Sequence, residues 1–262
     1  ISSQNQRQMK HTKVDILGTP VSSLTMDALF SDWERVIQKR EKAQVCITPV
    51  NSILAARATA RVQEIYRNAD YVLCDGVPVK WASQFLGNPI KERITGLDVL
   101  PRIFPFATSR NFSIFLLGAS PGVAEKLKAK MEEKHAGVKI VGTFVPPFRA
   151  VFSPEENRQM IEAINAVKPD ILLVSLTAPK QDIWIAENLK NLDTHLAIGI
   201  GGAFEVAAGM IKRAPLWMQK SGLEWFYRFL QEPKRMFRRY FVEAPVFIPL
   251  ILKQRFSTRS GR

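Results

Sequence analysis

Short runs of apolar and β-branched residues recur along the chain, separated by segments with the periodicity of helices. Residues 170–176, DILLVSL, are apolar after the first position, which is typical of a strand covered on both faces. Between Leu29 and Ile37 the apolar residues fall at i, i+4, i+7 and i+8, on one face of a helix. This alternation predicts an α/β fold with a doubly wound, mainly parallel sheet. The predicted strands cover residues 13–18, 45–50, 71–75, 112–118, 139–144, 170–176 and 195–202.

Two of the intervening segments begin with Ser-Pro. Ser153 is a predicted N-cap, with Pro154 at the first helical position and Glu156 at the third, the pattern of a capping box. Ser120-Pro121 repeats this entry before a second helical segment. We expect a helix to start at each of them.

The last 53 residues break the alternation. They are rich in Trp, Phe, Arg and Lys and are divided by prolines, which predicts several short helices. We therefore expect a flexible tail over residues 1–12, an α/β core over residues 13–209 and a helical C-terminal appendage over residues 210–262.

The net charge of +13 is concentrated in this appendage, where twelve Lys and Arg face three Glu. Such a balance favours a polyanionic partner, either nucleic acid or an anionic membrane surface. Aromatic residues interleave with the arginines over residues 224–252, which suits base stacking, a membrane interface or packing on the protein's own core. An apolar surface there could also be covered by a second copy of the chain in a homo-oligomer.

Polar residues follow several predicted strands. Asp75-Gly76 ends an apolar run, either as an ordinary turn or as a functional carboxylate, because open α/β folds place their chemistry beyond the carboxyl ends of parallel strands. Thr48 and Asn51 follow the preceding strand and would lie at the same edge, although Asn51 could simply cap a helix.

Glycine-bearing loops follow two other strands. Gly118, Ala119 and Ser120 form a small-residue loop before a helix, a candidate anion site or a tight turn. Gly201 and Gly202 would let a backbone approach a ligand closely. Gln181 could hydrogen-bond a uracil or a sugar hydroxyl, or be an exposed polar residue in a first helical turn.

Metal chemistry has no support in the sequence. The two cysteines and three histidines form no ligand pattern, and there is no DxD motif. We expect neither a metal nor another cofactor.

Seven stretches, taken in order, resemble the WecG/TagA/CpsF glycosyltransferases, glycosyltransferase family 26. They read TPVNSILAA, CDGVPVKWASQFLG, ERITGLDVL, FLLGASPGVAEK, APKQDIW, GIGGAFEVAAGMIKRAP and GLEWFYRFLQEPKRMFRRY, and the resemblance covers about residues 13–240.

The resemblance implies a Rossmann-like core, an appendage that helps close the active site, and an inverting enzyme. Such an enzyme moves a sugar from a UDP-sugar to a polyprenyl-diphosphate-linked sugar during synthesis of a cell-surface polysaccharide. The expected location is cytoplasmic, peripheral on the inner face of the bacterial plasma membrane. A non-enzymatic protein that binds nucleic acid is the remote alternative.

The resemblance also assigns roles to residues. Asp75 matches the proposed catalytic base, and Thr48 and Asn51 match polar residues of the same pocket. Gln181 matches a glutamine near the donor. Three arginines of the appendage match positions thought to hold the diphosphate of the donor or of the lipid acceptor: Arg235, Arg238 and Arg239. Arg93 is a further predicted residue for binding diphosphate or acceptor.

The chain departs from the family pattern around the expected donor pocket. Ser175-Leu176-Thr177 replaces a usual Gly-Leu-Gly, Asp182 replaces Glu, and Glu205 replaces Asp. These changes leave the donor open between UDP-N-acetylmannosamine and the UDP-glucose or UDP-galactose of exopolysaccharide enzymes.

Overall fold

The computed structural model describes residues 11–259, apart from the side chains of Lys220, Arg235, Arg239, Thr258 and Arg259. Its strands are β1 (Thr12–Ile16), β2 (Thr19–Ser23), β3 (Ala43–Thr48), β4 (Tyr71–Cys74), β5 (Ser113–Gly118), β6 (Lys139–Phe144), β7 (Ile171–Ser175) and β8 (Leu196–Gly199). The helices before residue 210 are α1 (Met26–Gln38), α2 (Val50–Ala58), α3 (Ala60–Asn68), α4 (Val77–Phe85), α5 (Gly96–Ser109), α6 (Val123–Lys134), α7 (Pro154–Val167), α8 (Lys180–Asn188), η1 (Leu189–Asn191) and α9 (Ala203–Ala207).

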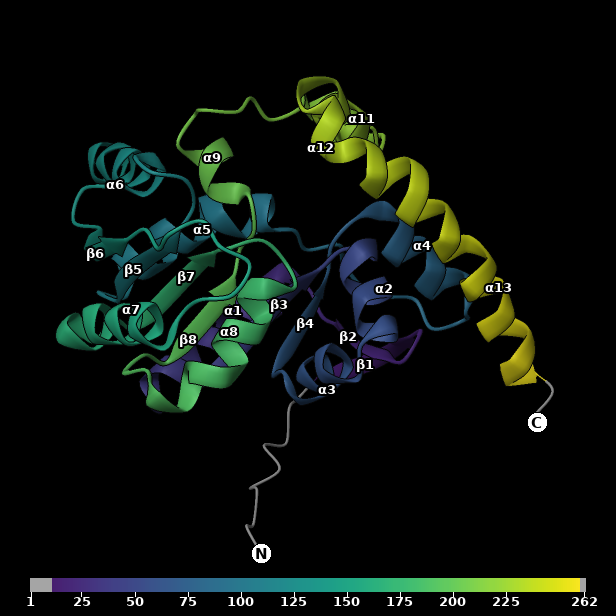
Figure 1. The fold of residues 1–262 in the computed structure, drawn as a ribbon, viewed down its shortest axis with the longest axis horizontal. Coiled ribbons are helices and arrows are strands. Elements are labelled where there is room, and N and C mark those ends of the chain that lie inside the picture. Colours follow the sequence, from purple (N-terminus) through teal and green to yellow (C-terminus); the bar gives the residue numbers. More distant parts are fainter. Residues whose placement is uncertain (1–10, 260–262) are drawn as a thin grey trace, which may run out of the picture.

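Six strands form one parallel sheet in the order β4-β3-β8-β7-β5-β6, which confirms the predicted fold class (Figure 1). The chain fills one side of the sheet with β3 and β4 and then crosses to β5 on the other side. Strand order therefore reverses near the centre, and open α/β folds bind ligands at such a reversal.

The first predicted strand does not join this sheet. β1 pairs antiparallel with β2 in a two-residue hairpin, in which Leu17 and Gly18 both have positive φ (53° and 84°). Two consecutive positive φ values are what the tightest hairpin turn needs, since its twist matches that of the strands. The predicted strand is therefore present, but it pairs antiparallel outside the parallel sheet because the turn returns the chain at once.

Helices cover both faces of the sheet (Figure 1). On one face α1, α5, α6 and α9 pack against alternate sheet residues in a cluster that includes Trp33 and Phe104. The apolar face of α1 predicted from Leu29 to Ile37 is buried in that cluster. On the opposite face Met160 of α7 and Trp184 of α8 pack against the intervening residues. The continuously apolar strand β7 lies between these two clusters.

One of the two predicted helix starts is confirmed. Ser153 Oγ accepts from the Glu156 N–H (3.2 Å), and a Glu156 carboxylate oxygen accepts from the Ser153 N–H (2.8 Å). The start at Ser120-Pro121 was wrong, because residues 120–123 form a turn and α6 begins at Val123. Its N-cap is Gly122, at φ 81°, a conformation that favours glycine.

Beyond α9 the chain forms α10 (Leu216–Lys220), α11 (Glu224–Gln231), α12 (Pro233–Phe237), the π-helical segment Arg238–Glu243 and α13 (Ala244–Arg259). These elements arch over the sheet edge, and α13 descends along α2 and α4 (Figure 1).

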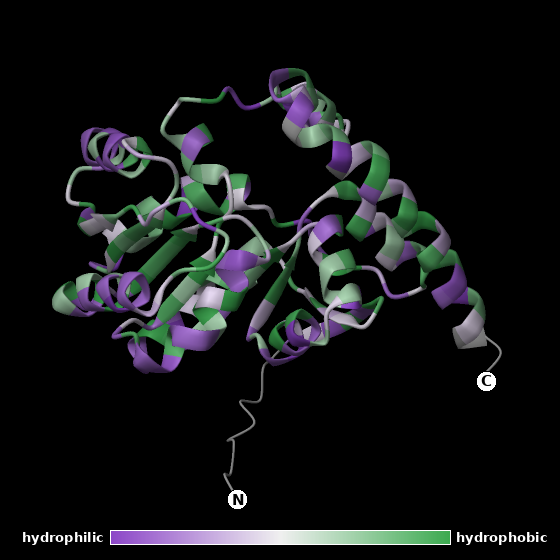
Figure 2. Ribbon diagram, in the orientation of Figure 1, coloured by the Kyte–Doolittle hydropathy of each residue, from purple (hydrophilic) through white to green (hydrophobic). Residues whose placement is uncertain are grey.

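The helix α13 packs on the core. Phe247 and Ile251 are buried in a cluster with residues of the hairpin and of α2. Gln254 bonds the backbone of Leu17 and Asp15, and Arg255 donates to the Leu86 carbonyl. Residues 244–252 of α13 are apolar, and the hydrophilic residues of this helix begin at Lys253, towards its C-terminal end (Figure 2). Within residues 11–259, no helix has the length and apolarity to cross a membrane.

Candidate active site

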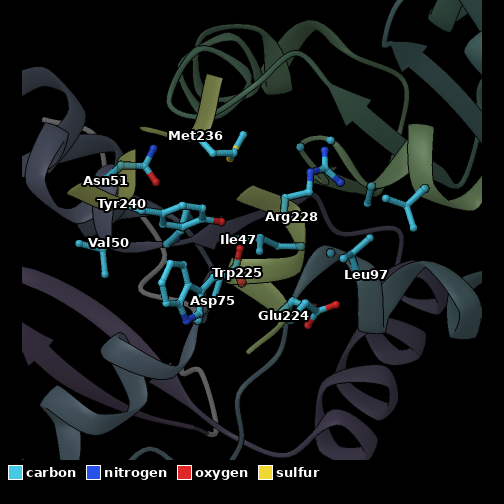
Figure 3. A pocket seen from close by; sticks show the side chains of 18 of the residues that line it. Ile47, Val50, Asn51, Asp75, Leu97, Glu224, Trp225, Arg228, Met236 and Tyr240 are labelled. Atoms are coloured by element: carbon cyan, nitrogen blue, oxygen red, sulfur yellow. The ribbon is translucent and has the colours of Figure 1, made fainter. Parts of the chain in front are cut away.

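A cavity of about 740 Å³ opens at the carboxyl ends of the strands, between the sheet and the C-terminal helices. Its floor comes from the loops after β3, β4, β7 and β8, and its roof from residues 212–244. The cavity therefore lies at the reversal of strand order. Figure 3 shows side chains of the floor and the roof converging on it.

Asp75 lies in the floor immediately after β4. Its backbone N–H donates to the Thr48 carbonyl (3.3 Å), which continues the pairing of β3 and β4 by one residue. Gly76 then turns the chain at φ 95° into α4. The strand and the glycine turn together bring the carboxylate into the cavity, among the residues labelled in Figure 3.

Asn51 and Thr48 have different surroundings. Asn51 is the second residue of α2, whose N-cap is Pro49, so the alternative of a capping role was wrong. Its Oδ1 is buried without a hydrogen-bond partner among the described residues, and the residue lines the cavity. Thr48 is fully buried, its hydroxyl donates to the Cys46 carbonyl (3.4 Å), and it is not among the lining residues. Asn51 thus lies in the wall of the cavity, whereas Thr48 lies behind it.

Gly201 and Gly202 line the floor, and their loop is fixed from below. Gln181 Oε1 accepts from the Gly201 N–H (3.0 Å), and Ser175 Oγ donates to the Gly201 carbonyl (2.7 Å). Gln181 is only 1% exposed, so the alternative of an exposed polar residue was wrong. It lines the cavity and positions the glycine loop.

The loop of Gly118, Ala119 and Ser120 does not line the cavity. It follows β5, which is separated from β3 by β8 and β7. The Ala119 N–H donates to the Ser175 carbonyl (2.8 Å) and is therefore occupied within the protein. A donor-binding role for this loop stays a prediction, and the cavity gives it no support.

Cations exceed acids in the cavity wall, where five Lys and Arg face three Asp and Glu. Of the predicted arginines, Arg93 and Arg238 line it, whereas the side chains of Arg235 and Arg239 lie outside the described residues. Three further cations line the cavity that were not among the predicted site residues: Lys212, Arg213 and Arg228. For Arg228, the interleaving of arginines with aromatics over residues 224–252 was the available signal.

Aromatic side chains complete the roof. Trp225 and Tyr240 pack edge to face with ring centroids 5.3 Å apart, and both line the cavity. Arg228 is ion-paired with Glu232 one helical turn away (2.7 Å). A carboxylate, an amide, arginines and aromatic faces thus surround one space, a combination that suits a sugar attached to a phosphate.

Comparison with known proteins decides between the function classes that the sequence left open. The model of the glycosyl transferase WecG/TagA/CpsF family matches residues 14–261. This chain belongs to that family. The assignment favours a glycosyltransferase over a nucleic-acid-binding protein.

Relatives in Staphylococcus aureus agree with the family assignment. The proteins from strains MW2 and MRSA252 are each 28% identical over 252 residues, covering 95% of this chain and 96% of the relative. Both are named N-acetylglucosaminyldiphosphoundecaprenol N-acetyl-beta-D-mannosaminyltransferase.

The departures from the family pattern are not equivalent in the fold of this glycosyltransferase. Thr177, at φ 66°, lines the cavity. Asp182 is fully buried, and neither it nor Glu205 is among the lining residues. Among Thr177, Asp182 and Glu205, Thr177 is thus the residue that can contact a ligand directly.

Asp182 belongs to a buried polar cluster beneath the glycine loop. It accepts from the Tyr66 hydroxyl (2.8 Å), and its side chain also interacts with Cys46 and Gln181. A Cβ at Gly199 would lie 2.7 Å from Asp182 Oδ1 and 2.8 Å from Gln181 Nε2, so only glycine leaves room for both side chains. Burial raises the pKa of Asp182 to about 7, partly offset by the hydrogen bonds that it accepts.

Asp182→Asn should flatten the pH dependence of stability. Because the folded-state pKa is raised, the folded protein holds a proton that the unfolded chain has already released between about pH 4 and pH 7. Wild-type stability should therefore fall as pH rises through this window, by about 1.4 kcal/mol per pH unit. Asparagine does not titrate, so urea unfolding of the variant at pH 5 and pH 7 should show a smaller difference.

Asp193→Asn is the matched control, because Asp193 is exposed and its Oδ2 lies 4.0 Å from Lys168 Nζ. This control should keep the wild-type dependence. An unchanged dependence in Asp182→Asn would show that the carboxyl titrates in its ordinary range.

Proposed function

We propose that this glycosyltransferase moves a sugar from a UDP-sugar to a polyprenyl-diphosphate-linked sugar, with inversion, in the synthesis of a bacterial cell-surface polysaccharide. The observation that carries the proposal is the presence of Asp75 and of arginines from the C-terminal helices in one cavity. The named activity of the staphylococcal relatives supports an acceptor of this class.

Asp75 is the proposed base. In an inverting transfer, the acceptor hydroxyl forms a bond to the anomeric carbon while the bond to UDP breaks, and the hydroxyl proton passes to a carboxylate within hydrogen-bond reach. Asp75 has the right chemistry and lies in the cavity floor. Asn51 lines the same cavity and is the proposed polar partner of a substrate hydroxyl.

The leaving diphosphate needs compensation of its charge. Arg93, Arg228 and Arg238 line the cavity, and arginine forms bidentate, charge-assisted bonds to phosphate oxygens. These arginines supply charge at the site where many other transferases use a metal ion. We therefore propose a metal-independent reaction.

The donor proposed first is UDP-N-acetylmannosamine, after the names of the relatives. The alternative is an exopolysaccharide glucosyltransferase that uses UDP-glucose, because Thr177 lies in the cavity wall where the family usually has glycine.

We further propose peripheral attachment to the anionic inner face of the plasma membrane. Large apolar side chains are exposed along α10 to α13, next to the basic residues, and this combination favours binding to anionic lipid. A homo-oligomer that covers the same surface would instead bury these side chains without lipid. The exposed apolar side chains of this surface are Leu216, Trp217, Trp225, Phe226, Leu230, Phe237, Phe241, Val242, Val246, Ile248, Leu252 and Phe256.

The test is UDP release from a panel of UDP-sugars, with and without polyprenyl-diphosphate-linked N-acetylglucosamine. We expect acceptor-dependent release from one donor, unchanged in EDTA. Activity lost in EDTA and restored by magnesium or manganese would contradict metal independence. Absence of release from every donor, with the lipid acceptor present, would contradict the proposed function.

A further inference from the structure

Four charged residues join the core to the C-terminal helices at one wall of the cavity. Arg93 lies in the loop before α5, Asp98 in its first turn, Arg213 between α9 and α10, and Glu224 at the start of α11. We call these four residues the junction cluster. Three of them, Arg93, Arg213 and Glu224, line the cavity directly.

Arg213 makes the close contacts of the junction cluster. Its Nη2 donates to Asp98 Oδ1 (2.5 Å) and its Nε to Glu224 Oε1 (2.9 Å). Its remaining Nη1 donates to the Leu97 carbonyl (2.8 Å). One guanidinium thus binds both carboxylates and the start of α5.

Arg93 faces the same two carboxylates at longer range. Its Nη2 lies 3.7 Å from Asp98 Oδ2, and its Nη1 lies 3.8 Å from Glu224 Oε2. Both separations exceed hydrogen-bond length. Arg93 is attracted to the pair without a hydrogen bond to it. Arg213 holds the other oxygen of each carboxylate, Asp98 Oδ1 and Glu224 Oε1, and so fixes the orientation of both.

The electrostatics of Asp98 agree with this division. Burial alone would raise the pKa of Asp98, but hydrogen bonds from Arg213 and Thr95, together with the charges of Arg213 and Arg93, leave it below its usual range. Arg213 is therefore the principal partner of that carboxylate. Without Arg213, two partly buried carboxylates would face Arg93 alone.

We propose that Arg213 is a positioning residue for diphosphate binding: by holding Asp98 and Glu224 it keeps Arg93 available to a phosphate group in the cavity. The proposal rests on the proposed function, in which a substrate brings a diphosphate to this space. Loss of Arg213 would let the two carboxylates capture Arg93 and so weaken anion binding indirectly.

A double-mutant cycle tests whether Arg213 acts through Arg93. The probe is inorganic pyrophosphate, with binding measured by titration calorimetry. Arg93→Gln and Arg213→Gln should each weaken binding about tenfold, since each removes one strong charge-assisted contact, directly or indirectly. The double variant should also be only about tenfold weaker. A loss of about a hundredfold, the product of the two, would overturn the proposal.

Glu224→Gln provides a second test that keeps the contacts of Arg213 with Asp98 and Leu97. Removing one of the two carboxylates should tighten pyrophosphate binding about threefold, since the attraction that competes for Arg93 is halved. Unchanged or weaker binding would overturn the proposal even if Arg213→Gln failed to fold.

The matched control is Arg102→Gln. Arg102 lies on α5, like Asp98, and its replacement breaks an exposed ion pair with Asp27 of α1. This control should bind pyrophosphate as the wild type does. The readout is independent of sugar transfer, so a wild type that binds pyrophosphate but releases no UDP would contradict the proposed function alone. A wild type that transfers sugar but binds no pyrophosphate would overturn the inference alone.

Discussion

Asp75→Asn is expected to lower kcat for sugar transfer by about 10²- to 10⁴-fold, the usual contribution of a positioned general base. Asparagine has nearly the same shape but cannot take the proton of the acceptor hydroxyl. The KM values of both substrates should change little, because the amide still fills the floor of the cavity beside Gly76. Initial rates of acceptor-dependent UDP release over a range of each substrate would separate the two parameters.

Asp27→Asn is the control for this experiment, since Asp27 is an exposed residue near the start of α1. It should retain wild-type kinetics. Full activity of Asp75→Asn would instead leave Asp75 as an ordinary turn residue. A rise in KM with unchanged kcat would make it a binding residue rather than a base.

Gly118→Ala is expected to reduce the free energy of unfolding by about 3 kcal/mol or more. A Cβ there would lie 2.4 Å from the Ser175 carbonyl oxygen, an atom of the neighbouring strand that cannot move without disturbing the sheet. The positive φ of 103° adds backbone strain. Overpacking typically costs about 1–3 kcal/mol, and a left-handed conformation costs an L-residue about 1–2 kcal/mol more.

Gly122→Ala separates these two contributions. Gly122 also has positive φ (81°), but nothing lies within 4 Å of the position of its Cβ. Its replacement should cost only the backbone term, about 1–2 kcal/mol. Urea unfolding of both variants measures the difference. Equal losses would show that the carbonyl contact at Gly118 is relieved by a small shift.

The fold class was predictable because its signals are local. Continuously apolar strands and helices with one apolar face indicate which residues are buried. The capping box at Ser153 is complete within four residues, so it too can be recognised from the local sequence. The hairpin and the start of α6 were missed for a local reason as well. Positive φ values at Leu17 and Gly122 decide those turns, and they leave no trace in the hydrophobic pattern.

The candidate site was only partly predictable because no local sequence pattern indicates the order of the strands in the sheet. Asp75, Asn51, Gln181 and Gly201 meet because β4, β3, β7 and β8 lie side by side. The loop of Gly118 carries a similar motif, yet β5 places it away from the cavity. Arg213 and Arg228 come from elements far along the chain, so their approach depends on how the C-terminal helices pack.

The C-terminal helices are held at both ends. The junction cluster attaches one end to α5, and Phe247, Ile251 and Gln254 attach α13 to the hairpin and to α2. Because both ends of this segment are attached to the core, the C-terminal helices cannot move away from the cavity as a flap attached at one end can. Any widening of the cavity therefore has to come from bending of the span between residues 224 and 244, and the lipid acceptor of the proposed reaction would have to enter with this span in place.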